Sequence, residues 1–280
     1  MKGRIAMKSK KAAAACLAVG FAMLGTTGII AYASGNPYEN YRTAVINTAA
    51  AQDMTVGASF SVSRDGTVIA DGTAVYEKNT DAVYSAVDAN VQGQNIMKEE
   101  YADTNIKIKS DGTTYSQKAR KKKDNENDNL TPSTIKLAQM TADLLVGDMN
   151  TRFTSDGSKV SVQLTGAQIP EIANTAASAF AEMTAAKDSQ KENDIFDSAV
   201  QQLDMTGNVK IESVTMSADI SGDMLSSQVL DIVMSGETSG GERSTYEISV
   251  NADITHIGST TPQSIDTSSM QESAFTDNED

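Results

Sequence analysis

The chain has 280 residues, of which 37 are acidic and 23 are basic, for a formal net charge of −14 at pH 7. Because such a chain repels phosphates, nucleic acid is excluded as a partner. One histidine and one cysteine are too few for a zinc site of nitrogen and sulfur ligands, and the absence of tryptophan argues against a carbohydrate-stacking cleft.

Residues 1–33 have the pattern of an export signal. A basic start, MKGRIAMKSKK, precedes an apolar run that begins at Ala12 and ends on Ala31-Tyr32-Ala33. The run is long enough to span a bilayer if uncut, so a retained membrane anchor is the alternative to cleavage. Gly25-Thr26-Thr27-Gly28 weakens a helix and favours cleavage. We therefore expect an extracellular or cell-envelope protein, in contact with a membrane only through residues 1–33 if they remain.

Cys16 lies near the start of the apolar run, whereas a lipidated cysteine would follow it, so no lipid anchor is expected. Cleavage would remove five basic residues and leave 18 against 37 acidic ones, a net charge of −19. It would also remove the only cysteine. The exported domain would then depend on its core for stability, without disulfides.

The exported part is expected to begin with a helix. Asn36 can cap it and Pro37 suits its first position, and the helix should continue to about Gln52. Its spacing places Tyr41, Val45 and Ala49 on the buried side.

Strands joined by Asp-Gly turns are expected next. Such turns occur at Asp65-Gly66, Asp111-Gly112 and Asp156-Gly157, each beside alternating apolar and polar residues. Strand–turn–strand units without helices between them predict an antiparallel meander. Residues 81–103 keep no strict period, so their pairing stays open.

Helices are expected in the middle of the chain and strands after them. One helix should run from about Thr131 to Gly147, one should start after Ile169, and a shorter one should cover residues 194–203. Strands return at 214–220, 230–234 and 246–254, the last with one wholly polar face. Residues 34–262 therefore form one predicted domain. Two segments read as unstructured: residues 118–129 (KARKKKDNENDN), an exposed loop, and the polar tail 263–280.

The sequence offers few candidate catalytic residues. His256, at the end of the last strand, is interpreted as a surface residue, because no nucleophile elbow surrounds any serine. Asp124, Glu126 and Asp128 have the spacing of a calcium loop, but Asn129 replaces the turn glycine and Ile135 the final glutamate. We expect no enzyme, metal or cofactor, although a carboxylate pair formed only in three dimensions stays open.

The order helix, antiparallel strands, central helices, antiparallel strands resembles the lipoprotein-carrier-like superfamily. Local support comes from the opening Asn36-Pro37-Tyr38-Glu39-Asn40-Tyr41, similar to exported proteins of Gram-positive anaerobes, and from the long strands over residues 218–254. The resemblance implies an α+β fold, in which a strongly curved antiparallel half-barrel packs on central helices and holds acyl chains between. The lipobox cysteine of lipidated members is missing here.

The expected function is that of a non-enzymatic envelope protein that binds a lipid or other hydrophobic ligand between sheet and helices. The lining is predicted to comprise strand and helix residues: Phe60, Val62, Leu144, Leu145, Phe180, Met183, Ile248 and Val250. The same residues would serve an ordinary core equally well. The alternative is a membrane-anchored extracellular sensing or protein-interaction domain with no small-molecule ligand, whose exposed loops contact an unknown partner.

Overall fold

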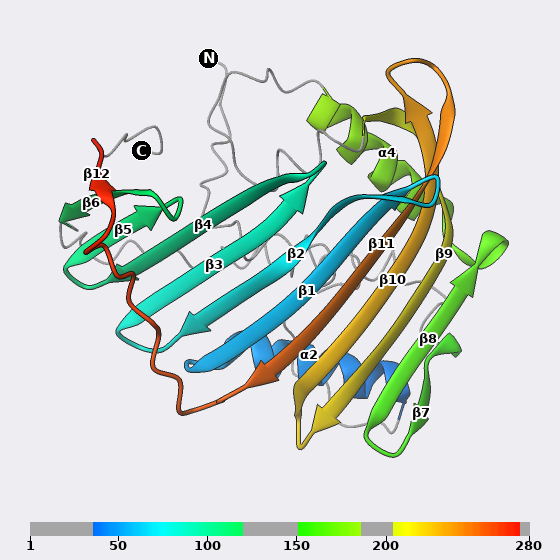
Figure 1. The fold of residues 1–280 in the computed structure, drawn as a ribbon. Coiled ribbons are helices and arrows are strands. Elements are labelled where there is room, and N and C mark those ends of the chain that lie inside the picture. Colours follow the sequence, from blue (N-terminus) through cyan, green and yellow to red (C-terminus); the bar gives the residue numbers. More distant parts are fainter. Residues whose placement is uncertain (1–35, 120–150, 186–203, 275–280) are drawn as a thin grey trace, which may run out of the picture.

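A computed structural model of the chain describes residues 36–119, 151–185 and 204–274. Their centre is one large open sheet of twelve strands (Figure 1). The strand order across it is β12-β6-β5-β4-β3-β2-β1-β11-β10-β9-β8-β7. All neighbours are antiparallel except β12 and β6, which are parallel. The predicted antiparallel meander is thereby confirmed.

The strands before the first gap are β1 (Met54–Arg64), β2 (Thr67–Lys78), β3 (Ala82–Val91), β4 (Gln94–Asp103), β5 (Ile106–Ser110) and β6 (Thr114–Ala119). The later strands are β7 (Thr154–Asp156), β8 (Lys159–Thr165), β9 (Met205–Ser221), β10 (Met224–Thr238), β11 (Arg243–Thr255) and β12 (Gln271–Glu272). The helices are α2 (Pro37–Ala50), the short 3-10 helix η2 (Gly166–Gln168) and α4 (Glu171–Ala185).

The three predicted Asp-Gly turns join β1 to β2, β5 to β6 and β7 to β8. At Asp65-Gly66 both residues have positive φ, 51° and 79°, as a tight two-residue hairpin requires. Residues 81–103, left open by the sequence, form the hairpin of β3 and β4. Its turn is Gln92-Gly93, again with two positive φ angles. The sequence did not predict this hairpin, because glutamine, at the first position of the turn, is not a typical turn residue.

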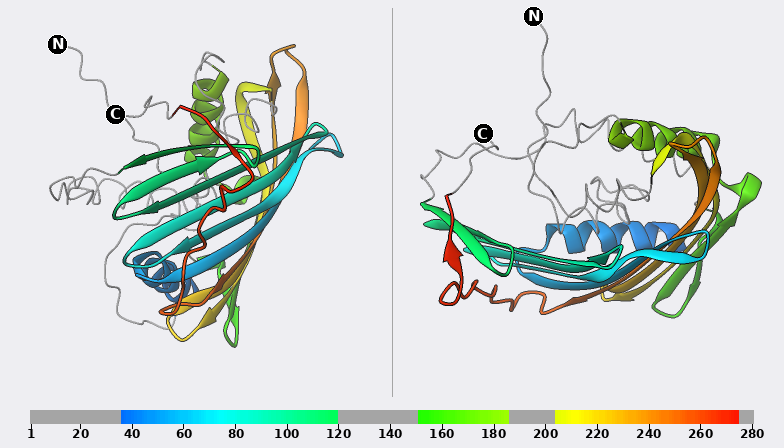
Figure 2. Two further views of the ribbon diagram at one scale, coloured as in Figure 1. Left: turned by 60° about the vertical axis from the view of Figure 1, so that its left-hand side comes forward. Right: turned by 45° about the horizontal axis from the view of Figure 1, so that its top comes forward.

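The sheet curves, and α2 and α4 both lie on its concave side (Figure 2). The predicted first helix is confirmed: Asn36 Oδ1 accepts a hydrogen bond of 2.9 Å from the Tyr38 backbone N–H at its start. Ala49, expected on the buried side, is exposed. Thr48 is buried instead, and its hydroxyl accepts a hydrogen bond of 2.8 Å from Leu225 N. This places the polar contact to β10 on the buried side of the last helical turn.

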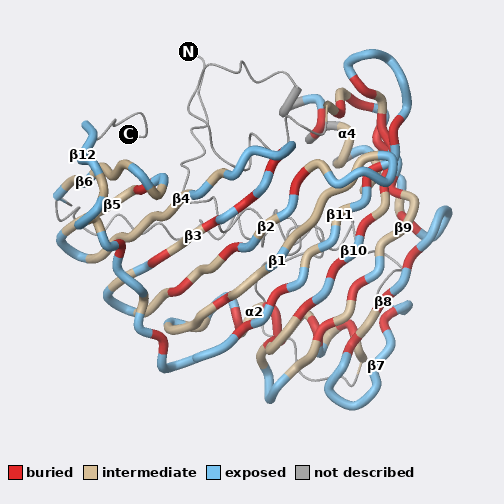
Figure 3. The backbone as a smooth tube through the Cα atoms, viewed as in Figure 1, coloured by how far each residue is buried: buried red, intermediate tan, exposed pale blue. Residues whose placement is uncertain are grey.

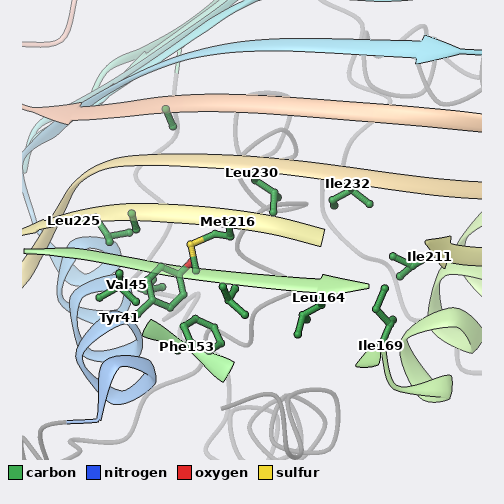
Figure 4. Close-up of a cluster of buried hydrophobic side chains, with 14 of the residues drawn as sticks. Tyr41, Val45, Phe153, Leu164, Ile169, Ile211, Met216, Leu225, Leu230 and Ile232 are labelled. Carbon is green, nitrogen blue, oxygen red and sulfur yellow. The ribbon is translucent and has the colours of Figure 1, made fainter. Parts of the chain in front are cut away.

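The larger hydrophobic core lies between α2 and β8–β11 (Figure 4). Tyr41 and Phe153 pack there with ring centroids 5.9 Å apart, against Met216 and Leu230. Tyr41 also donates a hydrogen bond of 3.1 Å to the buried Gln228 side chain. A smaller cluster covers β1–β4 on the same side of the sheet, with buried Ala70, Ala74, Val87, Ala89 and Val91 (Figure 3).

The carboxy-terminal residues correct one prediction. Residues 256–274, here called the C-terminal strap, run along the convex side of the sheet, opposite the helices (Figure 2). Gln263 donates to the buried Glu77 carboxylate through its backbone N–H (2.7 Å) and its side-chain amide (3.2 Å). Ile265 is buried, and β12 adds to the edge of β6. The expectation of a disordered tail from residue 263 is wrong up to Ala274, because a few residues in this polar segment dock on the sheet.

Several sequence predictions concern residues outside the described ranges. They are the export segment 1–33, the part of the charged loop beyond Ala119, and the helices at 131–147 and 194–203. Within the described ranges, no helix has both the length and the apolar character needed to cross a membrane. The helix predicted after Ile169 is confirmed as α4.

Candidate functional site

The candidate site is the apolar concave surface of β1 and β11. Four of the eight predicted lining residues meet there, because Phe60 lies directly opposite Val250 and Val62 opposite Ile248. The side chains of all four are half-buried, whereas core side chains are fully buried. Ile248 packs against the core that α2 covers, which places the set on the helix-bearing side. We call Ala58, Phe60, Val62, Ile248 and Val250 the apolar floor.

Small residues continue the surface across β2 and β3. Ala70, Gly72 and Ala74 lie opposite Val62, Phe60 and Ala58, and β3 adds Val87, Ala89 and Val91 in the next positions. Alanine and glycine keep this part of the surface low, so the Phe60 ring lies over the backbone of Gly72. Apart from Gly72, these residues of β2 and β3 are buried, at most 7% exposed, whereas the residues of the apolar floor beside them are half-buried.

The other four predicted lining residues do not add to this surface in the described part of the chain. Leu144 and Leu145 lie outside it. Phe180 and Met183 belong to α4, but their side chains are not among those described. Helix α4 itself is fixed over β9 by two side chains: Asn174 Oδ1 accepts from Ile211 N and Ser178 Oγ accepts from Val209 N, each at 2.8 Å.

Next to the smaller cluster, the concave side becomes basic. Lys98 on β4 lies opposite Val87, and the register places Lys107 and Lys109 of β5 and Lys118 of β6 on this same side. We call these four residues the lysine margin. Glu100 is the acidic side chain among them, and its Oε1 lies 2.7 Å from Lys107 Nζ.

Sequence reasoning missed the lysine margin. The alternation Ile106-Lys107-Ile108-Lys109 indicates a strand, and its isoleucines lie on the convex side with Tyr101, which leaves the concave side to the lysines. Once β4 and β5 are paired, the lysines at every second position share a face, as strand geometry demands. The signal was therefore present in the sequence, but the pairing of residues 81–103 had to be known before it could be read.

The convex side has the opposite character. Asp71, Asp88 and Asp231 lie exposed on it, and short hydrogen bonds fix two of them: Ser249 Oγ to Asp231 at 2.6 Å and Asn95 Nδ2 to Asp88 at 2.8 Å. In the described part of the chain, the two faces of β2–β6 therefore carry different charges. Acidic groups predominate on the convex side and basic groups on the concave margin.

No chemistry-bearing cluster is found in the described residues. His256 is exposed where β11 ends, as its surface interpretation predicted. Residues 36–119, 151–185 and 204–274 contain no group of three or more side chains placed to hold a metal ion. Tyr76, packed beside the apolar floor, has its pKa raised by burial, so its hydroxyl is neutral at physiological pH.

The sequence matches no model of a protein family and no curated protein. Among solved structures, the tesB protein of Mycobacterium avium subsp. paratuberculosis is 11% identical, with 83% of this chain and 94% of that one covered and a TM-score of 0.13. A conserved protein of unknown function with a hot dog fold from Alicyclobacillus acidocaldarius is 7% identical, with 83% and 88% covered and a TM-score of 0.11. Likeness at these TM-scores supports no inference about the fold or function of this chain.

Proposed function

We propose that this chain is an exported, non-enzymatic cell-envelope protein that binds a lipid or other hydrophobic ligand on the apolar floor. In this proposal the curved sheet is a single-domain half-barrel of the lipoprotein-carrier-like kind, and the ligand lies between the sheet and the helices on its concave side. The resemblance of the element order to that superfamily is consistent with such a role.

The observation that carries the proposal is the half-burial of the floor. Phe60, Val62, Ile248 and Val250 form a contiguous block on two central strands, where side chains of a filled core would be fully buried. By contrast Met216, Leu230 and Ile232, two strands or fewer away, are at most 2% exposed. Apolar surface left partly open gains about 25 cal/mol for each Å² that a ligand covers.

The test is native mass spectrometry of the full chain, expressed with its export segment in a host that contains lipid. Co-purified lipid at a defined stoichiometry is expected. Val62→Thr with Val250→Thr replaces two floor methyl groups by hydroxyls of similar size and should reduce the bound fraction. The matched control is Val229→Thr on β10, where the side chain is 38% exposed on the convex side. An unliganded mass for the wild type, with no uptake of a hydrophobic fluorescent probe, would overturn the proposal.

A further inference from the structure

We infer that the C-terminal strap is exchangeable: two copies of this chain form a dimer in which the strap of each copy docks on the convex side of the other. The interaction surface is the part of the convex side that the strap contacts on β1, β2, β5 and β6. Its partner is the same segment of a second copy. The inference does not depend on the proposed ligand, because the apolar floor lies on the opposite side of the sheet.

The first support is that the strap docks at separate points on the convex side (Figure 2). Thr260 Oγ1 lies 3.2 Å from Thr55 Oγ1 on β1, and Gln271 N donates to Thr113 O at 3.1 Å beside β6. Neither hydrophobic cluster of the described residues includes a residue of the strap. The strap can therefore leave the sheet while both clusters stay packed, as expected of a segment with few buried contacts.

The second support is the chemistry of the surface that the strap covers. Glu77 is 7% exposed, and its two carboxylate oxygens accept from the backbone N–H and the side-chain amide of Gln263. Ile265 is buried two residues further along the strap. An undocked strap loses these contacts, so docking is favoured on the same copy or on another. The surface matches a segment with an amide followed two residues later by a branched apolar side chain, and a second copy supplies that segment.

The third support is the turn that connects β11 to the strap. His256 has a φ of 52°, in the left-handed region that residues with a β-carbon rarely adopt, and Gly258 follows with a φ of 79°. His256 O accepts from Ser259 N at 3.0 Å and from Thr260 Oγ1 at 2.9 Å, which folds the strap back onto its own sheet. In the exchanged dimer this turn opens, and His256 leaves the left-handed region. Short strained hinges favour the exchange of a terminal element between copies.

The fourth support is the last contact of the strap. Its two-residue strand β12 adds to β6, which without it would be the outermost strand at that edge of the described sheet. Strand addition to an open edge is a common way for an extended segment of another chain to bind. The backbone bonds, such as the one from Ser273 N to Tyr115 O at 2.8 Å, are the same whether the two strands belong to one copy or to two.

The experiment traps the exchanged dimer with a disulfide in the full chain, after Cys16→Ala has removed the only cysteine. One preparation carries Thr55→Cys and the other Thr260→Cys, at positions whose side-chain oxygens lie 3.2 Å apart. The two are mixed at high protein concentration, incubated and oxidised. A disulfide-linked heterodimer is expected on a non-reducing gel. The control replaces Thr55→Cys by Ser59→Cys, which is exposed further along β1 and should give far less heterodimer.

A second measurement needs no cysteine variants, so it decides even if those variants fail to fold. Size-exclusion chromatography with light scattering should show a dimer of the wild type that increases with protein concentration. It should also increase with salt, because each copy carries a formal net charge of −14 and salt screens the repulsion. His256→Gly should lower the dimer fraction about fivefold, since glycine adopts the left-handed region without strain.

Three outcomes would overturn the inference. The first is a wild type that stays monomeric at every protein and salt concentration. The second is a heterodimer yield with Thr55→Cys no greater than with Ser59→Cys, which would indicate random collision of thiols. The third is an unchanged or larger dimer fraction for His256→Gly, which would mean that the dimer forms without opening the turn at His256.

Discussion

The aromatic ring of Phe60 lies over the backbone of Gly72, its direct partner on β2. A β-carbon at Gly72 would come within 3.0 Å of Phe60 Cζ and 2.8 Å of Ala89 Cα, and closer still to the Asp88 carbonyl oxygen. Aromatic side chains placed over a strand glycine compensate for its missing side chain and fix the register. Here the same contact also keeps the surface between the apolar floor and β3 shallow.

Gly72→Ala should therefore destabilise the fold. The methyl group would be forced into the backbone of β3 as well as the Phe60 ring, an overpacking that costs about 1–3 kcal/mol. Gly57→Ala on the neighbouring strand is the matched control, because a β-carbon there meets nothing within 4 Å. The control should be neutral or more stable by about 0.5–1 kcal/mol, since alanine loses less backbone entropy on folding. Urea unfolding of both variants makes the comparison, and equal stabilities would contradict it.

Much of the strand architecture could be predicted because its signals are local. Alternating apolar residues and Asp-Gly turns need only a few neighbouring residues to be read, and Phe60, Val62, Ile248 and Val250 came from that alternation. That the four would share one patch depended on β1 pairing with β11, a contact between segments almost 200 residues apart in the chain. The resemblance of element order implied a curved half-barrel packed on central helices, but no local pattern specifies that β1 pairs with β11.

The rest of the site could not be predicted for physical reasons that the structure makes plain. The lysine margin is a property of two strands together, since a lysine is assigned to a face only once its partner strand is placed. The strap is nearly all polar, and its docking rests on a few groups, among them Ile265 and the bonds of Gln263 to Glu77. The overall composition of the segment is polar and does not show which single residues dock on the sheet. The prediction of a disordered tail was based on that composition.

The strap provides the second prediction. Ile265 is 7% exposed, whereas Ile257 in the same segment is 37% exposed. Ile265→Ala should lower the free energy of unfolding by about 2–3 kcal/mol, because it removes buried methyl groups and leaves a cavity. Ile257→Ala should change it by less than about 0.5 kcal/mol. Urea unfolding gives both values, and limited proteolysis should show faster cleavage near residue 265 in the first variant alone. A similar small effect for both would mean that the strap does not stabilise the sheet.

The third prediction concerns acid. The backbone N–H groups of Thr114 and Thr113 donate to the Asp111 carboxylate at 2.6 Å and 2.9 Å and hold its pKa well below the usual range. A carboxyl with a lowered pKa in the folded state stabilises that state above its unfolded pKa of about 3.9, and the contribution is lost as pH falls through the lower folded pKa. Asp111→Asn keeps an acceptor oxygen without the charge. The wild type should therefore be the more stable at pH 7, and its advantage should fade between about pH 4 and pH 2.

Asp111→Ala serves as the control for that series, because it removes the acceptor at every pH. Its deficit relative to Asp111→Asn should be nearly constant from pH 7 to pH 2, since neither residue titrates. Urea midpoints at closely spaced pH values give the three curves. If wild type and Asp111→Asn ran parallel down to pH 2, the two turn N–H groups would not be stabilising the ionised carboxylate.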